Sequence, residues 1–262
     1  MTRVAIIGNS HVGALRDADS AIKSAFPTLE VTYFALARHR FNNAQYGEGG
    51  IFRADIPDEA ERKSVIEING MTEIDLHDYT HILVIGQGFL FNGLYTLIAQ
   101  HNILGLTDTG QTRSISQALL RDTMVLRIRG FGNRIARKFH DDPRFVIAQK
   151  PFPCLLHDAA TNHATTAAHP DAAHIGDLLR TTIADQMARH PVGFLPAPDA
   201  LLSGPLHTKP EFSRAAMLPA NQPPSPSDYT HVNARYGFEL FKIFANQWLG
   251  LVPVISPQTE KV

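Results

Sequence analysis

Short apolar runs alternate with longer segments of helical periodicity along this 262-residue chain, and this alternation restricts the fold more than any other feature. The runs are rich in β-branched and aromatic residues and occupy positions 4–7, 29–36, 81–86, 145–148 and 192–195. Apolar runs of this length are typical of strands that are buried on both faces. We therefore expect five buried strands.

The segments between the runs place apolar residues at the spacing of a helix. This spacing predicts helices over residues 12–22, 114–139, 175–189 and 232–249. Within the second of these, Gly130 and Gly132 predict a break or a kink. Strands that are separated by helices pair in parallel through right-handed crossovers, and the helices then cover both faces of the sheet. The chain is thus predicted to be an α/β protein with a mostly parallel five-stranded sheet between two helical layers.

The remaining stretches are predicted to be loops. Residues 38–52 are polar and contain glycine, residues 157–174 are rich in Ala, Thr and His, and residues 202–226 are rich in Pro and Ser. Residues 58–75 are mixed and charged and favour no single type of structure. Because the Pro-rich stretch lies between the last strand and the last helix, it marks no domain boundary. We expect one domain over residues 1–262.

The overall composition excludes several classes of protein. Hydrophobic residues make up 44% and charged residues 19% of the chain, which is typical of a globular protein with a substantial core. The net charge of −1 provides no general attraction to a polyanion, so nucleic acid is not an expected partner. Cys154, the only cysteine, allows no internal disulfide, and no CxxC pair suggests a structural zinc site.

The apolar segments are short throughout the chain. Residues 4–7 form too short a run for the core of a signal peptide, which together with the cysteine content predicts a cytoplasmic protein. There is also no stretch of about 20 apolar residues, so we expect no helix that inserts into a membrane.

Ser10 is the first candidate for chemistry. It follows the first predicted strand by two or three positions and directly precedes a predicted helix. In parallel sheets ligands bind at the carboxyl ends of the strands, where free N–H groups of helix N-termini are available. Such a position suits a nucleophilic hydroxyl and part of an oxyanion hole. The alternative is that Ser10 or Asn9 only caps the helix.

Asp228 and His231 are the second candidates. They lie three residues apart, just before the last predicted helix. Serine hydrolysis requires a base that takes the hydroxyl proton and a carboxylate that orients this base, and these groups occur in any chain order. The alternative is that Asp228 or Thr230 caps the helix and that His231 is an exposed residue.

Both sites resemble signature blocks of the SGNH/GDSL hydrolase superfamily. Residues 6–11, Ile-Ile-Gly-Asn-Ser-His, resemble its first block, with Gly-Asn-Ser in place of the commoner Gly-Asp-Ser. Residues 228–231, Asp-Tyr-Thr-His, resemble its last block, and Asn233, Tyr236 and Gly237 fit the way in which many members continue. The resemblance spans nearly the whole chain and implies a flavodoxin-like α/β/α fold.

The resemblance also implies a mechanism. Ser10 would attack an ester carbonyl, His231 would act as general base and then as general acid, and Asp228 would orient His231. The expected substrate is an O-acylated carbohydrate or another small acyl ester, and neither a metal nor an organic cofactor is needed. Two alternatives remain open: an O-acyltransferase that uses the same site, and a glycan-binding protein of the same fold with weak catalytic activity. The residues do not indicate an oligomeric state.

The oxyanion hole is less clearly encoded. The family has a glycine after the second strand, for which Gly47, Gly49 and Gly50 are candidates, with a simple glycine turn as the alternative. After the third strand the family has Gly-x-Asn-Asp, whereas this chain has Gly-Gln-Gly at residues 86–88. Gln87 is a candidate for the missing amide donor, and the more distant Asn92 or backbone N–H groups are alternatives. The expected donors are therefore Ser10, Gly49, Gly50 and Gln87.

Two further clusters favour structural roles. The spacing of the histidines at 157, 163, 169 and 174 matches no metal-ligand motif, so a polar loop is expected there instead of a metal site. The basic residues of the long helical segment are expected to form a solvated face: Arg121, Arg127, Arg129, Arg134, Arg137 and Lys138.

Overall fold

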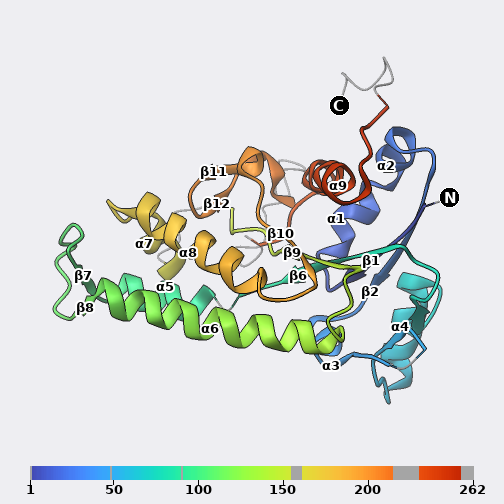
Figure 1. Ribbon diagram of the computed structural model, residues 1–262, viewed down its shortest axis with the longest axis horizontal. Helices are drawn as coiled ribbons and strands as arrows, with labels where there is room; N and C mark the ends of the chain where they lie inside the picture. The colour runs from blue at the N-terminus through green and yellow to red at the C-terminus, as the bar shows by residue number, and fades with distance from the viewer. Residues whose placement is uncertain (1, 48, 90, 155–160, 215–229, 255–262) are drawn as a thin grey trace. The chain divides into compact units, whose positions relative to one another are not determined.

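The computed structural model describes residues 2–47, 49–89, 91–154, 161–214 and 230–254 (Figure 1). The chain forms two compact units, each made from separate stretches of sequence. The first comprises Met1–Gln87, Arg144–Ala148 and His231–Val262, and the second comprises Gly88–Pro143 and Gln149–Thr230. Because the two units alternate along the sequence, this division does not test the expectation of a single domain, which stays a prediction.

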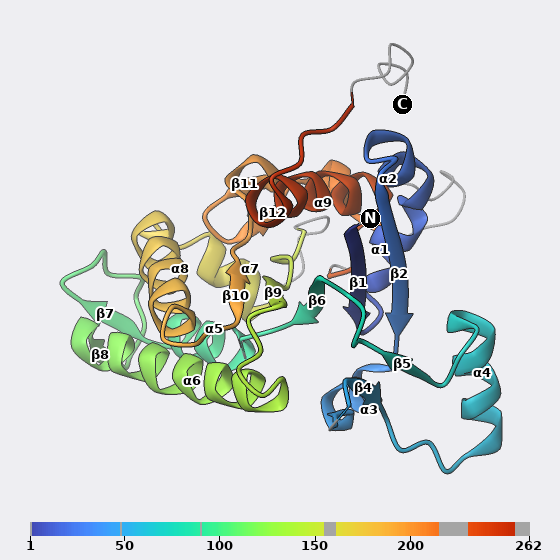
Figure 2. The same ribbon diagram turned by 45° about the vertical axis from the view of Figure 1, so that its right-hand side comes forward.

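The principal sheet has five strands, at the positions predicted from the apolar runs. They are β1 (Thr2–Gly8), β2 (Leu29–Ala35), β6 (His81–Gln87), β9 (Phe145–Gln149) and β10 (Gly193–Leu195). Their order is β10-β9-β6-β1-β2, and β1 is parallel to both of its neighbours, as Figure 2 shows for β2. Counted along the chain, the order is 2-1-3-4-5 from the β2 edge, which is that of the flavodoxin-like folds. The predicted α/β fold class is confirmed.

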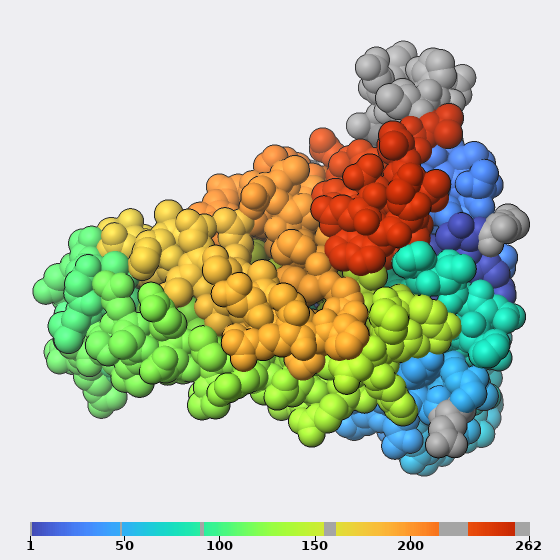
Figure 3. All heavy atoms as spheres, viewed as in Figure 1, coloured from blue at the N-terminus to red at the C-terminus, as the bar shows by residue number. Residues whose placement is uncertain are grey.

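Strand β1 lies at the centre of the first unit. Successive side chains of a strand point to opposite faces, and every residue from Val4 to Gly8 is buried, so both faces of β1 are covered. Helices α1 (Val12–Asp17), α2 (Asp19–Ala25) and α9 (Ala234–Leu249) pack against one another. In the space-filling view, the red atoms near the C-terminus lie against blue atoms of the N-terminal part (Figure 3).

A small antiparallel sheet and two helices complete the first unit. The sheet consists of β3 (Gln45–Tyr46), β4 (Ile51–Arg53) and β5 (Glu73–Asp75), and the helices are α3 (Arg38–Asn43) and α4 (Glu59–Asn69). Phe52 of β4 packs against Phe34 of β2 and Phe41 of α3. The expectation of a loop over residues 38–52 was therefore wrong, because strands of two or three residues are too short to show an alternating pattern.

The second unit is mainly helical. It contains α5 (Phe91–Ala99), α6 (Gln117–Lys138), α7 (Asn162–Ala167) and α8 (Ala172–Met187), the pair β7 (Asn102–Leu104) and β8 (Ser114–Ser116), and the pair β11 (Leu202–Gly204) and β12 (His207–Thr208). Two short 3-10 turns, η1 (Asp199–Leu201) and η2 (Pro210–Phe212), flank the β11–β12 pair. Helix α5 packs on α7 and α6 packs on α8. Among the described residues, no helix is long and apolar enough to span a membrane.

Three local expectations in the second unit were wrong. Helix α6 continues unbroken through Gly130 and Gly132, from Gln117 to Lys138. The tract 157–174 contains α7 and the start of α8 in its described part, because the Thr161 side chain caps an alanine-rich segment by accepting from Ala164 N–H. Part of the stretch 202–226 forms β11 and β12, while residues 215–226 lie outside the described residues.

Candidate active site

Ser10 lies in the turn between β1 and α1. Val12 N–H donates to the Asn9 carbonyl at 3.0 Å and Gly13 N–H donates to the Ser10 carbonyl at 3.1 Å, so α1 begins directly after the turn. Gly8 is the last residue of β1, and the position requires glycine because an added Cβ would lie 2.3 Å from the Ile85 carbonyl oxygen. The Ser10 side chain is thereby exposed at the carboxyl end of the sheet, where β1 and β6 flank the point at which the strand order reverses. In open α/β sheets, ligands bind at this point.

Asn9 joins the ends of β1 and β6. Its Nδ2 donates to the Gly86 carbonyl at 2.9 Å, and its Oδ1 accepts from His11 N–H at 3.2 Å. Gly86 has a φ of +84°, and an added Cβ there would lie 2.1 Å from Asn9 Oδ1. The buried amide and the glycine are therefore packed together, and this contact fixes the turn that carries Ser10.

His231 approaches Ser10 from the start of α9. Its Nε2 lies 2.8 Å from Ser10 Oγ, although the two residues are 221 positions apart in the sequence. The packing of α1 on α9 explains this proximity: a Cβ on Gly237 would lie 2.3 Å from the Ala14 carbonyl oxygen, so the helices cross in close contact. The residues that precede the two helices consequently meet.

The capping alternatives for Ser10 and Thr230 are not supported, whereas the Asn9 side chain does accept from the backbone N–H of His11 at the start of α1. The N-cap residue of α1 is His11, which makes no side-chain cap hydrogen bond, and Ser10 Oγ faces His231 instead. Helix α9 is capped by Asn233, whose side chain accepts from Tyr236 N–H at 3.2 Å. Asp228 lies outside the described residues, so its predicted role stays a prediction.

His11 was not predicted as a site residue. Its ring stacks on that of His231, with the ring centroids 5.1 Å apart and an angle of 29° between the planes. His11 is only 4% exposed. No spacing rule in the sequence identifies such a partner, because the contact depends on the crossing of α1 and α9. Its position directly after the candidate nucleophile was the only available signal.

The structure does not bring Gly49 and Gly50 to Ser10. Both lie in the turn between β3 and β4, with φ of +86° and +83°. A Cβ on Gly50 would lie 3.2 Å from the backbone nitrogen of His77, which precedes the start of β6. This is the amino end of β6, whereas Ser10 follows the carboxyl end of the parallel β1, so the length of a strand, roughly 20 Å, separates them. Gly49 and Gly50 therefore form a glycine turn between β3 and β4, and their prediction as oxyanion-hole residues was wrong.

Gln87 lies at the correct edge of the sheet. It is the last residue of β6, is 8% exposed, and follows Gly86, which contacts Asn9. Its side chain makes no hydrogen bond to any residue that the structure describes, and the same holds for the backbone N–H of Ser10. Two N–H donors are thus available near the end of β1 and β6. Asn92 belongs to the second unit, and its role stays a prediction.

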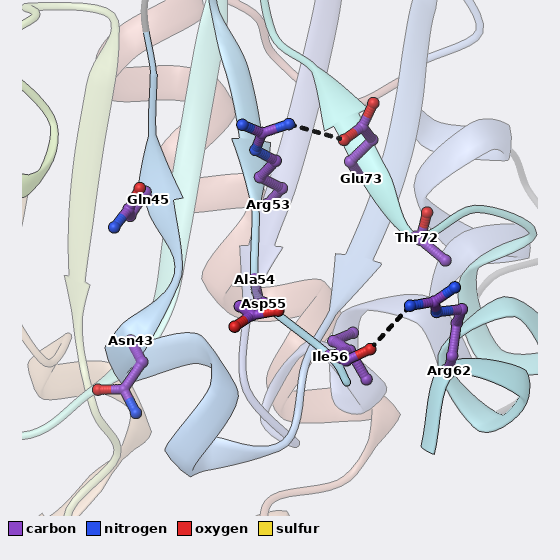
Figure 4. Close-up of a pocket in the computed structure, with 9 residues that line it drawn as sticks. All are labelled: Asn43, Gln45, Arg53, Ala54, Asp55, Ile56, Arg62, Thr72 and Glu73. Carbon is purple, nitrogen blue, oxygen red and sulfur yellow. Dashed lines mark hydrogen bonds and ion pairs between the residues drawn. The ribbon is translucent and has the colours of Figure 1, made fainter. Parts of the chain in front are cut away.

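A separate polar hollow of about 450 Å³ lies beside β3, β4, β5 and α4 (Figure 4). It is lined by Asn43, Gln45, Arg53, Ala54, Asp55, Ile56, Arg62, Thr72 and Glu73. Arg53 pairs with Glu73 at 4.0 Å, and Arg62 donates to the Ile56 carbonyl at 3.1 Å. These charged groups thus have partners within the hollow, and neither Ser10 nor His231 belongs to its lining.

The histidine tract and the basic helix have structural surroundings. His163 is buried and its Nε2 lies 3.0 Å from the Leu206 carbonyl, while its ring packs edge-on to His207. Among the described parts of the chain, no three His, Cys, Asp or Glu residues form a group that could hold a metal ion. The arginines of α6 are exposed, as expected for a solvated face: Arg121, Arg127, Arg129, Arg134 and Arg137. The expectation was wrong for Lys138, which is only partly exposed and whose pKa burial lowers to about 8.

Comparisons with known proteins do not identify a family. No protein-family model matches the chain, and no curated protein matches it. Among solved structures, a GDP-L-fucose synthetase from Naegleria fowleri aligns with 75% of this chain and 54% of that chain, at 9% identity and a TM-score of 0.24. A similarity of this degree carries no argument about the function of the chain. The fold class therefore follows from the strand order and the burial pattern.

Proposed function

We propose that this protein is a serine hydrolase of the SGNH/GDSL type, which cleaves acyl esters through an acyl-serine intermediate. The observation that carries the proposal is the distance of 2.8 Å between Ser10 Oγ and His231 Nε2. An imidazole nitrogen at hydrogen-bond distance can accept the hydroxyl proton as the oxygen attacks. The location at the strand-order reversal and the resemblance of residues 6–11 and 228–231 to the family's blocks support the same assignment.

The reaction would proceed in two steps. In the first, Ser10 Oγ attacks the ester carbonyl carbon while His231 Nε2 takes the hydroxyl proton; the C–O bond then breaks and His231 gives the proton to the leaving alcohol. In the second, water attacks the acyl-serine with His231 as base, and the carboxylic acid leaves as Ser10 regains its proton. Asp228 would orient His231 through the other ring nitrogen.

The developing oxyanion requires donors on the same edge of the sheet. We assign this role to the Ser10 backbone N–H and to the side-chain amide of Gln87, because both lie at the carboxyl ends of adjacent strands and make no hydrogen bond to other described residues. Gln87 would then replace the asparagine of the family's third block. Removal of one oxyanion donor typically lowers the rate about 100- to 1000-fold.

The proposed substrate is an O-acylated carbohydrate or another small acyl ester. Side chains and backbone N–H groups supply all the groups that this reaction requires, so the proposal includes no cofactor. If a sugar hydroxyl replaced water in the second step, the same site would act as an O-acyltransferase. Parallel measurement of acid release and of acyl transfer to a glycan acceptor distinguishes the two.

An activated serine can be tested with a fluorescent fluorophosphonate and with p-nitrophenyl acetate. We expect the wild-type protein to be labelled and to hydrolyse the ester, and we expect Ser10→Ala to abolish both. His231→Gln should lower the rate of labelling by at least about 1000-fold, because the base is lost. Peptide mapping should locate the label on Ser10.

The matched control is Ser24→Ala, which removes an exposed hydroxyl from α2 and should leave labelling unchanged. Full labelling of the Ser10→Ala protein, or a label mapped to another residue, would overturn the assignment. A wild-type protein that is not labelled but binds glycans tightly would favour a binding protein over an enzyme.

A further inference from the structure

We propose that His11 is a positioning residue for His231: its ring holds the imidazole in the plane that directs Nε2 to Ser10. This inference rests on the proposed hydrolase function and adds a residue to the site. The stacked rings, 5.1 Å apart with an angle of 29° between their planes, carry it.

The surroundings of His231 show why a ring on its face matters. On its carboxyl side the chain is fixed, because Val232 is buried and Asn233 caps α9. The backbone is thereby held, but rotation of an imidazole about χ2 is only weakly restricted by its own torsional preference. Offset-stacked aromatic rings resist such rotation through contact and electrostatic complementarity. A flat neighbour therefore restricts the ring of His231 to the plane in which Nε2 lies 2.8 Å from Ser10 Oγ.

His11 is itself held firmly, as a positioning group must be. Its backbone N–H donates to Asn9 Oδ1, and the Asn9 amide is fixed to the Gly86 carbonyl of β6. The ring is buried, with 4% of the residue exposed. The same turn thus carries Ser10, the proposed nucleophile, and His11, whose ring packs against the proposed base His231.

The decisive experiment compares His11→Leu, which removes the flat ring at similar volume, with His11→Phe, which retains a ring without ionisable nitrogens. With p-nitrophenyl acetate, we expect kcat of the Leu variant to fall roughly tenfold while KM stays within about twofold, since reaction geometry and not substrate binding is affected. The Phe variant should recover kcat to within about threefold of the wild type. His174→Leu, an exposed histidine on α8, is the matched control and should retain full activity.

A second measurement is independent of catalysis. In histidine-labelled protein, the ring protons of His231 should lose the upfield ring-current shift in His11→Leu and keep it in His11→Phe, with thermal unfolding used to confirm that both variants fold.

An unchanged kcat and unchanged His231 shift in the Leu variant would overturn the proposal. Equal losses of kcat in the Leu and Phe variants would also overturn it, because the imidazole chemistry of His11 would then be required. If the wild-type protein neither hydrolyses esters nor labels at Ser10, the hydrolase proposal fails, and the shifts alone decide whether His11 holds the ring.

Discussion

At the scale of single residues, the candidate site depends on polar side chains that hold the backbone and on glycines that let chain segments approach. Asn9 binds the Gly86 carbonyl on β6 and the His11 N–H of its own turn, while Gly8 and Gly86 make room for the neighbouring atoms. Ser10 and His231 are therefore located by residues that would take no part in bond making. A loss of activity at such positions has a geometric cause.

Asn9→Leu tests this dependence. The substitution leaves the Gly86 carbonyl and the His11 N–H without their partner, and each buried group that is left unpaired costs about 1–3 kcal/mol. We expect the free energy of unfolding in urea to fall by about 2 kcal/mol or more, and Ser10 to be labelled more slowly. Asn43→Leu, at an exposed position, should change stability by less than about 0.5 kcal/mol. Equal stability of the two variants would contradict the role of Asn9.

At the scale of elements, the crossing of α1 and α9 creates the juxtaposition of Ser10 and His231. The helices meet at Gly237, where the backbone of Ala14 occupies the space that a side chain would need. Because this neighbour is backbone, it cannot move aside without shifting α1. The distance between Ser10 Oγ and His231 Nε2 thus depends on the absence of a side chain at Gly237.

Gly237→Ala is expected to lower stability, whereas the same substitution at Gly130 is expected to raise it. At Gly237 the clash at 2.3 Å should lower the free energy of unfolding by about 1–3 kcal/mol and reduce esterase activity more than tenfold. At Gly130, in the middle of α6, an added Cβ has nothing within 4 Å, and alanine should stabilise by about 0.5–1 kcal/mol. Thermal unfolding and ester hydrolysis measure both effects. A stabilised and fully active Gly237→Ala protein would refute this account of the crossing.

The buried histidines of the second unit predict an acid sensitivity. Burial, together with the nearby His163, lowers the pKa of His207 to about 4 from the ordinary 6.5, and burial also lowers the pKa of His163. Between pH 6.5 and about pH 4, His207 is protonated in the unfolded chain but neutral in the folded protein. Stability should therefore decrease as the pH falls from about 6.5 towards 4, by at most about 1.4 kcal/mol per pH unit for one group. Urea unfolding of His207→Phe should show a smaller slope over this range, whereas an identical slope would exclude His207 as the cause.

At the scale of the whole molecule, the sequence predicted the principal sheet well because β1, β6 and β9 are almost entirely buried and thus form apolar runs, and because β2 and β10, although only partly buried, keep apolar residues. The β3–β5 sheet was missed because it has too few residues for periodicity, and α7 because a capped alanine-rich segment resembles a polar loop in composition. Ser10 and His231 were proposed from the sequence because each lies just before a predicted helix and within a segment that resembles a signature block of the SGNH/GDSL superfamily. The pairing of His11 with His231 and the distance of Gly50 from Ser10 depend on tertiary packing, which local patterns do not encode.

The separation of 221 residues between Ser10 and His231 has a consequence for synthesis and folding. The turn that carries Ser10 is translated 221 residues before His231, the proposed base. Contacts of such long range form late, because a large loop must close before they contribute stability. A nascent or partly folded chain would thus have no competent serine, and the onset of hydrolysis would report the completion of the fold.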